Sequence, residues 1–227
     1  MMDTSTAAPP TRSSQVERTR WFPAIRYDGF AKRALDLVLA LLLLSTLGPI
    51  ILILCLIVRL DGGPGLFGHP RIGRDGRSFR CWKIRTMVPN AGERLEQLLA
   101  SDPKAREEWE RDHKLRNDPR VTRLGNFLRE TSLDELPQIW NVLTGEMSLI
   151  GPRPVTETEL ERYGSHRPVY LSLRPGVTGL WQVSGRNDTS YDRRVQLDAE
   201  YRQRISPRTD LGILLRTVGV VLNRTGC

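Results

Sequence analysis

An apolar run from Leu35 to Val58 constrains the fold of this 227-residue chain more than any other feature. After Asp36 the run contains no charged residue. At a rise of 1.5 Å per residue, a helix of about 20 apolar residues matches the hydrocarbon core of a bilayer. A helix in the core of a soluble protein usually keeps one polar face, which this run lacks. The run therefore predicts a helix embedded in a membrane.

The middle and the flanks of this run argue against a straight crossing. Gly48-Pro49 lies at the middle, and a proline inside a helix removes an amide hydrogen and kinks or breaks the helix. Both flanks are basic, whereas a single crossing places its more positive flank in the cytoplasm. We therefore expect a re-entrant helix hairpin broken at Pro49, with Ser45 or Thr46 satisfying the freed backbone groups. The flanking cations are Arg26, Lys32, Arg33, Arg59, Arg71, Arg74, Arg77, Arg80, Lys83 and Arg85.

Averages over the whole chain hide this division. The chain has 34 Lys and Arg against 26 Asp and Glu, a net charge of +8, and a mean hydropathy of −0.35. These values describe a soluble basic protein, but they mix a membrane segment with a polar remainder. We predict a disordered N-terminal tail at 1–27, a membrane-embedded segment at 28–59 and a cytoplasmic domain at 60–227.

The domain at 60–227 is expected to be mainly α-helical with small β content. Alternating apolar residues predict a strand at Ser78–Met87. Helices are predicted at about 90–114, at 133–143, and as a pair over 192–223 that is broken near Ser206-Pro207. The last helix carries an apolar face flanked by arginines, which suits either a core helix or a membrane-surface helix. That face consists of Leu211, Leu214, Leu215, Val218, Val221 and Leu222.

Several kinds of site are disfavoured by what the sequence lacks. Cys55, Cys81 and Cys227 form no Cys-x-x-Cys pair, so a disulfide framework is not indicated and a reducing compartment fits. The three histidines are isolated and show no zinc-ligand spacing. Neither a Walker A motif nor Gly-x-Gly-x-x-Gly occurs, which disfavours nucleoside triphosphatases and dinucleotide-binding enzymes.

Asp134 and Glu135 are the candidate catalytic pair. Ser132-x-x-Glu135 resembles a capping box, and Pro137 suits a first helical turn because it lacks an amide hydrogen. The pair is therefore expected at a helix N-terminus, where the dipole favours ionised carboxylates that can attack phosphorus without a separate base. Ordinary helix capping explains the same pattern, so both alternatives remain open. The residues expected to face the core are Leu136, Ile139, Trp140 and Leu143.

Arginines gather on both sides of this pair, several of them in Gly- and Pro-rich segments. Guanidinium groups bind phosphate oxygens in bidentate fashion, and neighbouring Pro and Gly suggest fixed loops. This pattern favours a polyanionic substrate at a membrane surface, with solvated charge attracted to anionic lipid as the alternative. The arginines are Arg116, Arg120, Arg123, Arg129, Arg153, Arg174 and Arg186.

A series of motifs in a fixed order carries a family resemblance. They are Lys32-Arg33-x-x-Asp36, His69-Pro-Arg-Ile-Gly73, Lys83-Ile-Arg-Thr-Met87, Asp118-Pro-Arg-Val-Thr-Arg-Leu-Gly125, the string from Leu133 to Leu143, Gly145-Glu-Met-Ser148, Gly151-Pro-Arg-Pro154, the string from Arg174 to Arg186, and Leu197-Asp198 with Tyr201. From about residue 30 to its end, the chain resembles the bacterial sugar transferase family, the monotopic polyprenyl-phosphate phosphoglycosyl transferases. It is similar to the short members that initiate exopolysaccharide synthesis.

The resemblance implies a reaction, a cofactor and a fold. The family moves a sugar-1-phosphate from a UDP-sugar to polyprenyl phosphate, such as undecaprenyl phosphate, and releases UMP. Asp134 matches its nucleophile, which forms a covalent phosphosugar intermediate, and Glu135 matches the partner that assists through a Mg2+ site. The implied fold is a re-entrant membrane helix hairpin with a cytoplasmic catalytic domain and surface-lying amphipathic helices. Substrate or phosphate contacts are implied for Lys83, Arg85, Arg129, Arg153, Arg186 and Asp210.

The resemblance also implies a location and partners. The expected location is the cytoplasmic face of the bacterial inner membrane, and the expected partners are a UDP-sugar, polyprenyl phosphate and the anionic inner leaflet. The string from Ser184 to Tyr191 is similar to that of galactose- or glucose-transferring members, and a homodimer is left open. The alternative is a non-catalytic membrane-anchored basic protein that binds anionic lipid or nucleic acid. No nucleic acid partner is expected, because base-reading motifs and aromatic platforms are missing.

Overall fold

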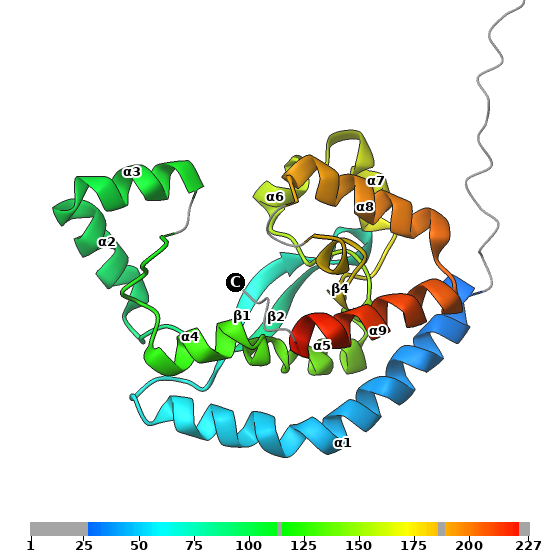
Figure 1. The fold of residues 1–227 in the computed structure, drawn as a ribbon, viewed down its shortest axis with the longest axis horizontal. Coiled ribbons are helices and arrows are strands. Elements are labelled where there is room, and N and C mark those ends of the chain that lie inside the picture. Colours follow the sequence, from blue (N-terminus) through cyan, green and yellow to red (C-terminus); the bar gives the residue numbers. More distant parts are fainter. Residues whose placement is uncertain (1–26, 113–114, 186–188, 223–227) are drawn as a thin grey trace, which may run out of the picture.

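The computed structural model describes residues 27–112, 115–185 and 189–222, and it is mostly helical with two small sheets (Figure 1). The predicted tail at 1–27 lies outside the described residues except for Tyr27. The helices are α1 Lys32–Arg59, α2 Ala91–Ser101, α3 Pro103–Asp112, α4 Arg123–Glu130, α5 Gln138–Thr144, α6 Glu157–Glu161, α7 Arg167–Leu171, α8 Tyr191–Arg204 and α9 Pro207–Leu222. The strands are β1 Leu66–Ile72, β2 Ser78–Ile84, β3 Ser148–Ile150 and β4 Gly176–Thr178. Single helical turns are η1 Tyr27–Ala31, η2 Arg74–Gly76, η3 Leu133–Glu135, η4 Gly164–His166 and η5 Trp181–Val183.

Helix α1 contains the whole apolar run. Its 28 residues make it about 42 Å long. Among the described helices it is the only one long and apolar enough to cross a membrane. The helix continues through Pro49, so the expected break there is not an end of the helix; instead α1 curves along the base of the molecule (Figure 1). Ser45 and Thr46 each donate a hydroxyl hydrogen bond to the carbonyl of Leu42, within their own helix.

Both ends of α1 are bonded to the same polar body. At the start, Arg33 donates to the carbonyl of Val142 over 2.7 Å, and the Asp36 carboxylate accepts from the amide of Leu149 over 3.1 Å. At the end, the carbonyl of Val58 accepts from Arg85 over 3.0 Å. The two ends of the apolar helix α1 therefore lie against one domain, with the bend between them.

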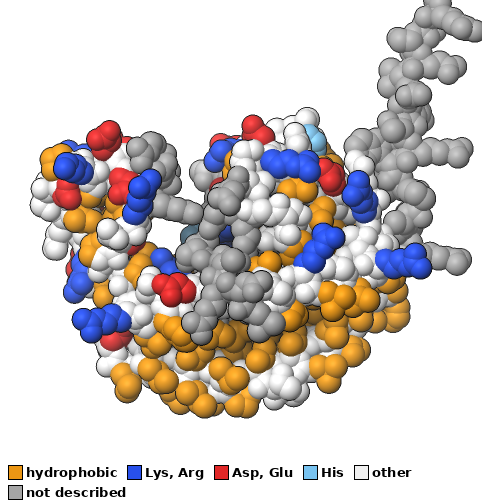
Figure 2. All heavy atoms as spheres, in the orientation of Figure 1, with side chains coloured by type: hydrophobic (Ala, Val, Ile, Leu, Met, Phe, Trp, Pro, Cys, Tyr) orange, Lys and Arg blue, Asp and Glu red, His pale blue; other side chains and the backbone are white. Residues whose placement is uncertain are grey.

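The outer side of α1 belongs to a continuous apolar face. Figure 2 shows hydrophobic side chains gathered along the edge formed by α1. Helix α9 adds a stripe with the spacing i, i+4, i+7, while its Ile213 packs into the core. The exposed apolar residues of this face are Val38, Leu41, Leu42, Leu52, Ile53 and Leu56 of α1 and Leu211, Leu215 and Val218 of α9. A soluble monomer rarely exposes an apolar patch of this extent, which indicates a membrane or protein partner.

The two sheets lie between α1 and the helices on the opposite side. Strands β1 and β2 form an antiparallel hairpin in which Leu66 faces Ile84 and Ile72 faces Ser78. Strands β3 and β4 pair in parallel, and this pairing brings Gly151 and Gly176 together. A Cβ atom added to Gly176 would lie 2.1 Å from the backbone nitrogen of Gly151. Only glycine therefore fits at this crossing.

The main core lies between α1, α5, α8, α9 and the two sheets. Its fully buried members are contributed by elements far apart in the sequence: Ala40, Cys81, Val142, Met147, Ile150, Tyr201, Ile205 and Ile213. The predicted break near Ser206-Pro207 is confirmed, since α8 ends at Arg204 and α9 begins at Pro207. The helix predicted over 90–114 is two helices, because Pro103 begins a new one after Ser101.

Candidate active site

Strand β2 and helix α5 form the frame of the site. Asn141 of α5 is fully buried, accepts a hydrogen bond from the amide of Trp82 over 3.0 Å and donates to the carbonyl of Arg80 over 2.7 Å. A buried polar side chain that satisfies two strand backbone groups fixes a helix on that strand. This contact sets the turn η3, which precedes α5, beside Lys83 of β2.

The turn that carries the carboxylates differs from the predicted capping box. Ser132 has a positive φ of 57° and makes no side-chain cap bond, so the chain reverses there between α4 and η3. Asp134 and Glu135 lie in this single turn, and α5 begins only at Gln138 after Pro137. A capping box is present instead at Thr156 and Glu159, at the start of α6. A non-glycine residue in the left-handed region is uncommon and is often found at functional sites.

The two carboxylates have different surroundings. The Asp134 side chain is 11% exposed, whereas the Glu135 side chain is 38% exposed. The Lys83 ammonium lies 2.6 Å from Oε1 of Glu135 and 3.6 Å from Oδ2 of Asp134. Lys83 thus forms its short ion pair with the more exposed carboxylate and a longer one with the buried carboxylate.

Trp140 of α5 points to the surface with 56% exposure, so the prediction that it faces the core is wrong.

Burial and neighbouring charges set the protonation of the site. Burial raises the pKa of Asp134, Lys83 lowers it, Glu135 raises it, and Arg129 lowers it again, with a net rise. Burial alone would lower the pKa of Lys83, but the carboxylates of Glu135 and Asp134 outweigh burial and raise it. The lysine therefore stays charged at neutral pH and helps to keep the buried carboxylate ionised.

Arg129 and Arg153 add positive charge around the carboxylates. The Nε atom of Arg129 donates to the hydroxyl of Thr86 over 2.9 Å, which holds the guanidinium near Asp134. Arg153 is exposed, lies over the ring of Trp181 at 5.8 Å and is close enough to Lys83 to lower its pKa. The structure thus brings together four of the predicted site positions beside Asp134: Lys83, Arg129, Glu135 and Arg153.

Arg85 lies away from these groups, although it was expected to bind phosphate. Its guanidinium donates to the carboxylate of Asp61 and to the carbonyls of Val58, Pro64 and Met87. These five hydrogen bonds use all five N–H groups of an arginine. No donor remains for a phosphate, so the arginine ties the end of α1 to the domain.

Asp210 also has a different setting from the one expected. It is fully buried in α9 and accepts hydrogen bonds from Lys32 over 2.6 Å, Tyr201 over 2.8 Å and Tyr27 over 2.9 Å. These contacts give Asp210 a structural role, because they join α9 to the start of α1, and they leave no substrate contact.

Arg186, the remaining predicted phosphate ligand, lies outside the described residues.

A cysteine beside the site is not a competing nucleophile. Cys81 is 2% exposed, and burial raises its pKa to about 11 despite the nearby Lys83. The thiol is therefore protonated at neutral pH, and only a thiolate is a strong nucleophile. Cys81 therefore does not compete with the carboxylates of this site as a nucleophile.

Sequence reasoning missed the side chains that position this site. Asn141 fixes α5, Thr86 holds Arg129, and Trp181 is a buried platform under Arg153 and Arg194. The signal for Asn141 was present in the sequence, since it is a polar residue inside the apolar run from Ile139 to Leu143. A buried polar side chain needs partners and usually fixes a fold contact.

Comparison with known proteins places these features in a family. A family model described as bacterial sugar transferase matches residues 27–224. The "UDP-galactose-lipid carrier transferase" of Erwinia amylovora is 56% identical over 197 residues, which cover 87% of this chain and 41% of that protein. The "Undecaprenyl-phosphate galactose phosphotransferase" of Salmonella typhimurium is 52% identical over 203 residues, 89% of this chain and 43% of that protein.

A shorter relative matches over nearly its whole length. The "Exopolysaccharide production protein ExoY" of Sinorhizobium fredii is 49% identical over 194 residues, which are 85% of this chain and 86% of that protein. The chain thus spans about two fifths of the length of the first two relatives and most of the length of the third. Together with the family match over almost the whole chain, these identities show that the chain belongs to the bacterial sugar transferase family.

Proposed function

We propose that this protein transfers a sugar-1-phosphate from a UDP-sugar to polyprenyl phosphate, with Asp134 as the nucleophile. The observation that carries the proposal is a buried carboxylate beside a charged lysine, with Arg129 and Arg153 close by. The names of the relatives, which specify galactose or glucose phosphate transfer to a lipid carrier, support the same reaction class. A hexose is therefore the sugar we propose, in the first membrane step of exopolysaccharide synthesis.

The first step forms a covalent intermediate on Asp134. A carboxylate oxygen attacks the β-phosphorus of the UDP-sugar, and the bond from that phosphorus to the bridging oxygen breaks. UMP leaves with the bridging oxygen and its electron pair, and the sugar phosphate stays on the carboxylate. Arg129 and Arg153 are placed to stabilise charge on the phosphate oxygens, as guanidinium groups do in other phosphoryl transfers.

The second step moves the sugar phosphate to the lipid. An oxygen of polyprenyl phosphate attacks the same phosphorus, the bond to the Asp134 carboxylate breaks, and a polyprenyl diphosphate sugar forms. Lys83 serves both steps, because its charge reduces repulsion between the carboxylates and an incoming anion. No proton transfer to the nucleophile is needed, since the carboxylate enters and leaves ionised.

Asp134 and Glu135 also fit a magnesium ion that is shared with the substrate. The described residues contain no group of three or more His, Cys, Asp and Glu side chains arranged to hold a metal. Mg2+ is commonly held by one or two carboxylates together with substrate phosphates and water, which matches two adjacent carboxylates beside a diphosphate. When bound, the ion would neutralise charge on the diphosphate.

The membrane arrangement we propose is re-entrant, with the domain on the cytoplasmic face of the inner membrane. Support comes from the two ends of α1, which are both bonded to one body by Arg33, Asp36 and Val58. A straight crossing would place those ends on opposite sides of the bilayer. The exposed apolar stripe on α9 extends the same face, so α9 would lie on the membrane surface.

An assay of the two half-reactions tests the proposed function. The full chain in detergent is incubated with a panel of UDP-hexoses and Mg2+, with and without polyprenyl phosphate, and UMP release is measured. We expect stoichiometric UMP release without the lipid and sustained turnover with it, because the lipid regenerates the free carboxylate. Salt-sensitive binding to anionic lipid or nucleic acid with no UMP release from any UDP-hexose would instead favour a non-catalytic protein.

Substitution of Lys83 by methionine is expected to move the acid limb of the pH–rate profile. Lys83 lowers the pKa of Asp134, so removing the charge raises that pKa further and the active ionised form is lost at a higher pH. We expect the acid limb of the kcat/KM profile to shift to higher pH in Lys83→Met, and Lys83→Arg to keep it close to its wild-type position. An acid limb that does not move in Lys83→Met would show that Lys83 does not control the ionisation of Asp134.

A further inference from the structure

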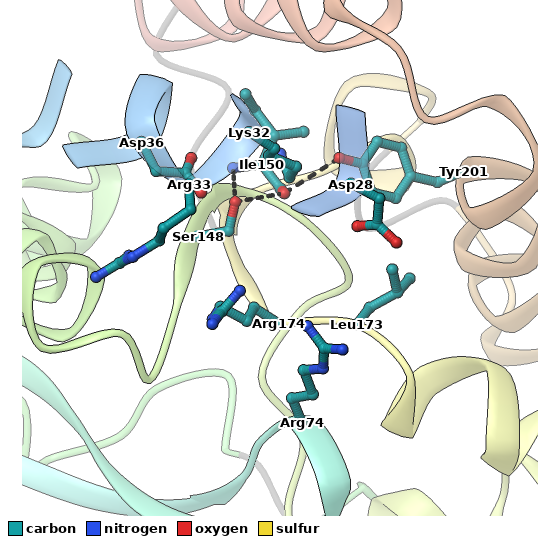
Figure 3. A pocket seen from close by; sticks show the side chains of 10 residues that line it. All are labelled: Asp28, Lys32, Arg33, Asp36, Arg74, Ser148, Ile150, Leu173, Arg174 and Tyr201. Carbon is teal, nitrogen blue, oxygen red and sulfur yellow. Dashed lines mark hydrogen bonds between the residues drawn. The ribbon is translucent and has the colours of Figure 1, made fainter. Parts of the chain in front are cut away.

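A second group of cations lies around a narrow pocket at the start of α1, formed by other elements than the Asp134 site. Figure 3 shows Arg74, from the turn between β1 and β2, extending towards Arg174. Arg33 and Lys32 of α1 line the pocket from the other side. The catalytic carboxylates and Lys83 are not among its lining residues.

Positive charge in this pocket is only partly balanced by the protein. Lys32 is paired with Asp210 over 2.6 Å, and the lining carboxylate of Asp28 is paired with Arg202 over 2.7 Å. The other lining carboxylate, Asp36, is 4% exposed and accepts a hydrogen bond from the amide of Leu149. Three guanidinium groups therefore face one remaining carboxylate, and the balance favours an anion. These guanidinium groups belong to Arg33, Arg74 and Arg174.

The guanidinium groups differ in how many of their N–H donors already form hydrogen bonds with the protein. Arg33 donates to two carbonyls, of Val142 and Leu143, which hold it in place without cancelling its charge. Arg174 donates only its Nε, to the carbonyl of Gly145 over 3.0 Å, among the hydrogen bonds of the described residues. The Nη atoms of Arg174 thus remain as donors for a ligand.

Repulsion among the arginine side chains of this pocket also favours an anionic ligand. Burial lowers the pKa of Arg174, and the charges of Arg74 and Arg33 lower it further. The nearest acid to Arg74 is its neighbour Asp75, at 3.8 Å on an exposed turn, which screens it weakly. Two positive groups that lie close together without a counterion are stabilised by a bound anion that accepts hydrogen bonds from both.

We propose that this pocket binds a phosphate group between Arg74 and Arg174, as a site separate from the Asp134 centre. The planar donors of arginine suit the tetrahedral oxygens of a phosphate. The pocket lies where the apolar helix meets the polar body, so a phospholipid headgroup and a free phosphate are both sources of this chemistry. The site does not depend on the transfer reaction proposed for Asp134.

Calorimetric titration of the full chain in detergent tests this site with two probes, inorganic phosphate and dihexanoylphosphatidylglycerol. Arg74→Gln and Arg174→Gln are each expected to weaken binding at the pocket by about tenfold or more. Arg77→Gln is the matched control, because exposed Arg77 follows the same turn but does not line the pocket. Phosphate bound near Asp134 is common to all variants and cancels in the comparison.

The two probes separate the sources of the phosphate. Saturation by inorganic phosphate with no gain from the lipid identifies a free anion as the ligand, and tighter binding of the phospholipid identifies a headgroup; either supports the site. Arg74 is exposed, so its substitution is expected to leave the fold intact, and that variant decides the test even if Arg174→Gln misfolds. Equal affinities of wild type, Arg74→Gln and Arg77→Gln for both probes would overturn the proposal.

Discussion

Replacing Asp134 by asparagine is expected to reduce UMP release on the order of 10⁴-fold while leaving the fold intact. The carboxamide has nearly the shape of the carboxylate but carries no negative charge, and it cannot form a covalent phosphosugar by direct attack. The substitution is expected to be mild for stability, since Asn has nearly the same shape and places no charge at this buried position. The loss is measured as the initial rate of UMP release at saturating UDP-sugar and polyprenyl phosphate.

Asp192→Asn is the matched control for this substitution. Asp192 is an exposed residue in the first turn of α8, and the same chemical change there is expected to leave the rate within about twofold of wild type. Glu135→Gln is expected to give an intermediate loss, because it removes the short ion pair with Lys83 but not the nucleophile. Full activity of the Asp134→Asn variant would show that Asp134 is not the nucleophile.

Replacing Asp210 by alanine is expected to destabilise the protein by about 3–5 kcal/mol, through a structural contact and not through catalysis. The substitution leaves the Lys32 ammonium buried without its partner and removes the acceptor of two tyrosine hydroxyls, Tyr27 and Tyr201. For a chain of this size the loss corresponds to a fall in Tm of about 10 °C. The fall is measured by tryptophan fluorescence during thermal unfolding in detergent.

A second substitution in the same pair makes this prediction specific. Lys32→Met in the Asp210→Ala background removes the stranded charge, and we expect it to recover part of the lost Tm. A purely additive loss in the double variant would show that Lys32 and Asp210 are not coupled. If Asp210 instead bound substrate, Asp210→Ala would lower turnover while the Tm stayed unchanged.

The sequence predicted features that depend on local pattern. After Asp36 the run from Leu35 to Val58 has no charged residue and no polar face, and it therefore predicted the long apolar helix that the structure shows. The break near Ser206-Pro207 also follows from local residues, as does the strand predicted over Ser78–Met87, although β2 ends earlier, at Ile84. By contrast, β3 and β4 have three residues each and lie in a Gly- and Pro-rich region, where so short a pattern cannot be distinguished from a loop.

The roles of the cations could not be separated by sequence alone. Arg85 and Lys83 are two residues apart on the same segment, yet Lys83 pairs with Asp134 and Glu135 whereas Arg85 pairs with Asp61. Which of them faces Asp134 is decided by the docking of α5 on β2 through Asn141, a contact between residues far apart in the chain. A basic residue near a motif therefore predicts charge at the site but not the partner of that charge.

The covalent intermediate on Asp134 is the central claim, and peptide mass spectrometry tests it most directly. The full chain is incubated with a UDP-hexose in the absence of polyprenyl phosphate, quenched, digested and compared with the Asp134→Asn variant. We predict that the wild-type peptide containing Asp134 gains the mass of a hexose phosphate and that the adduct disappears when polyprenyl phosphate is added. An adduct on another residue, or catalytic turnover with no adduct on Asp134 at any time, would contradict the claim.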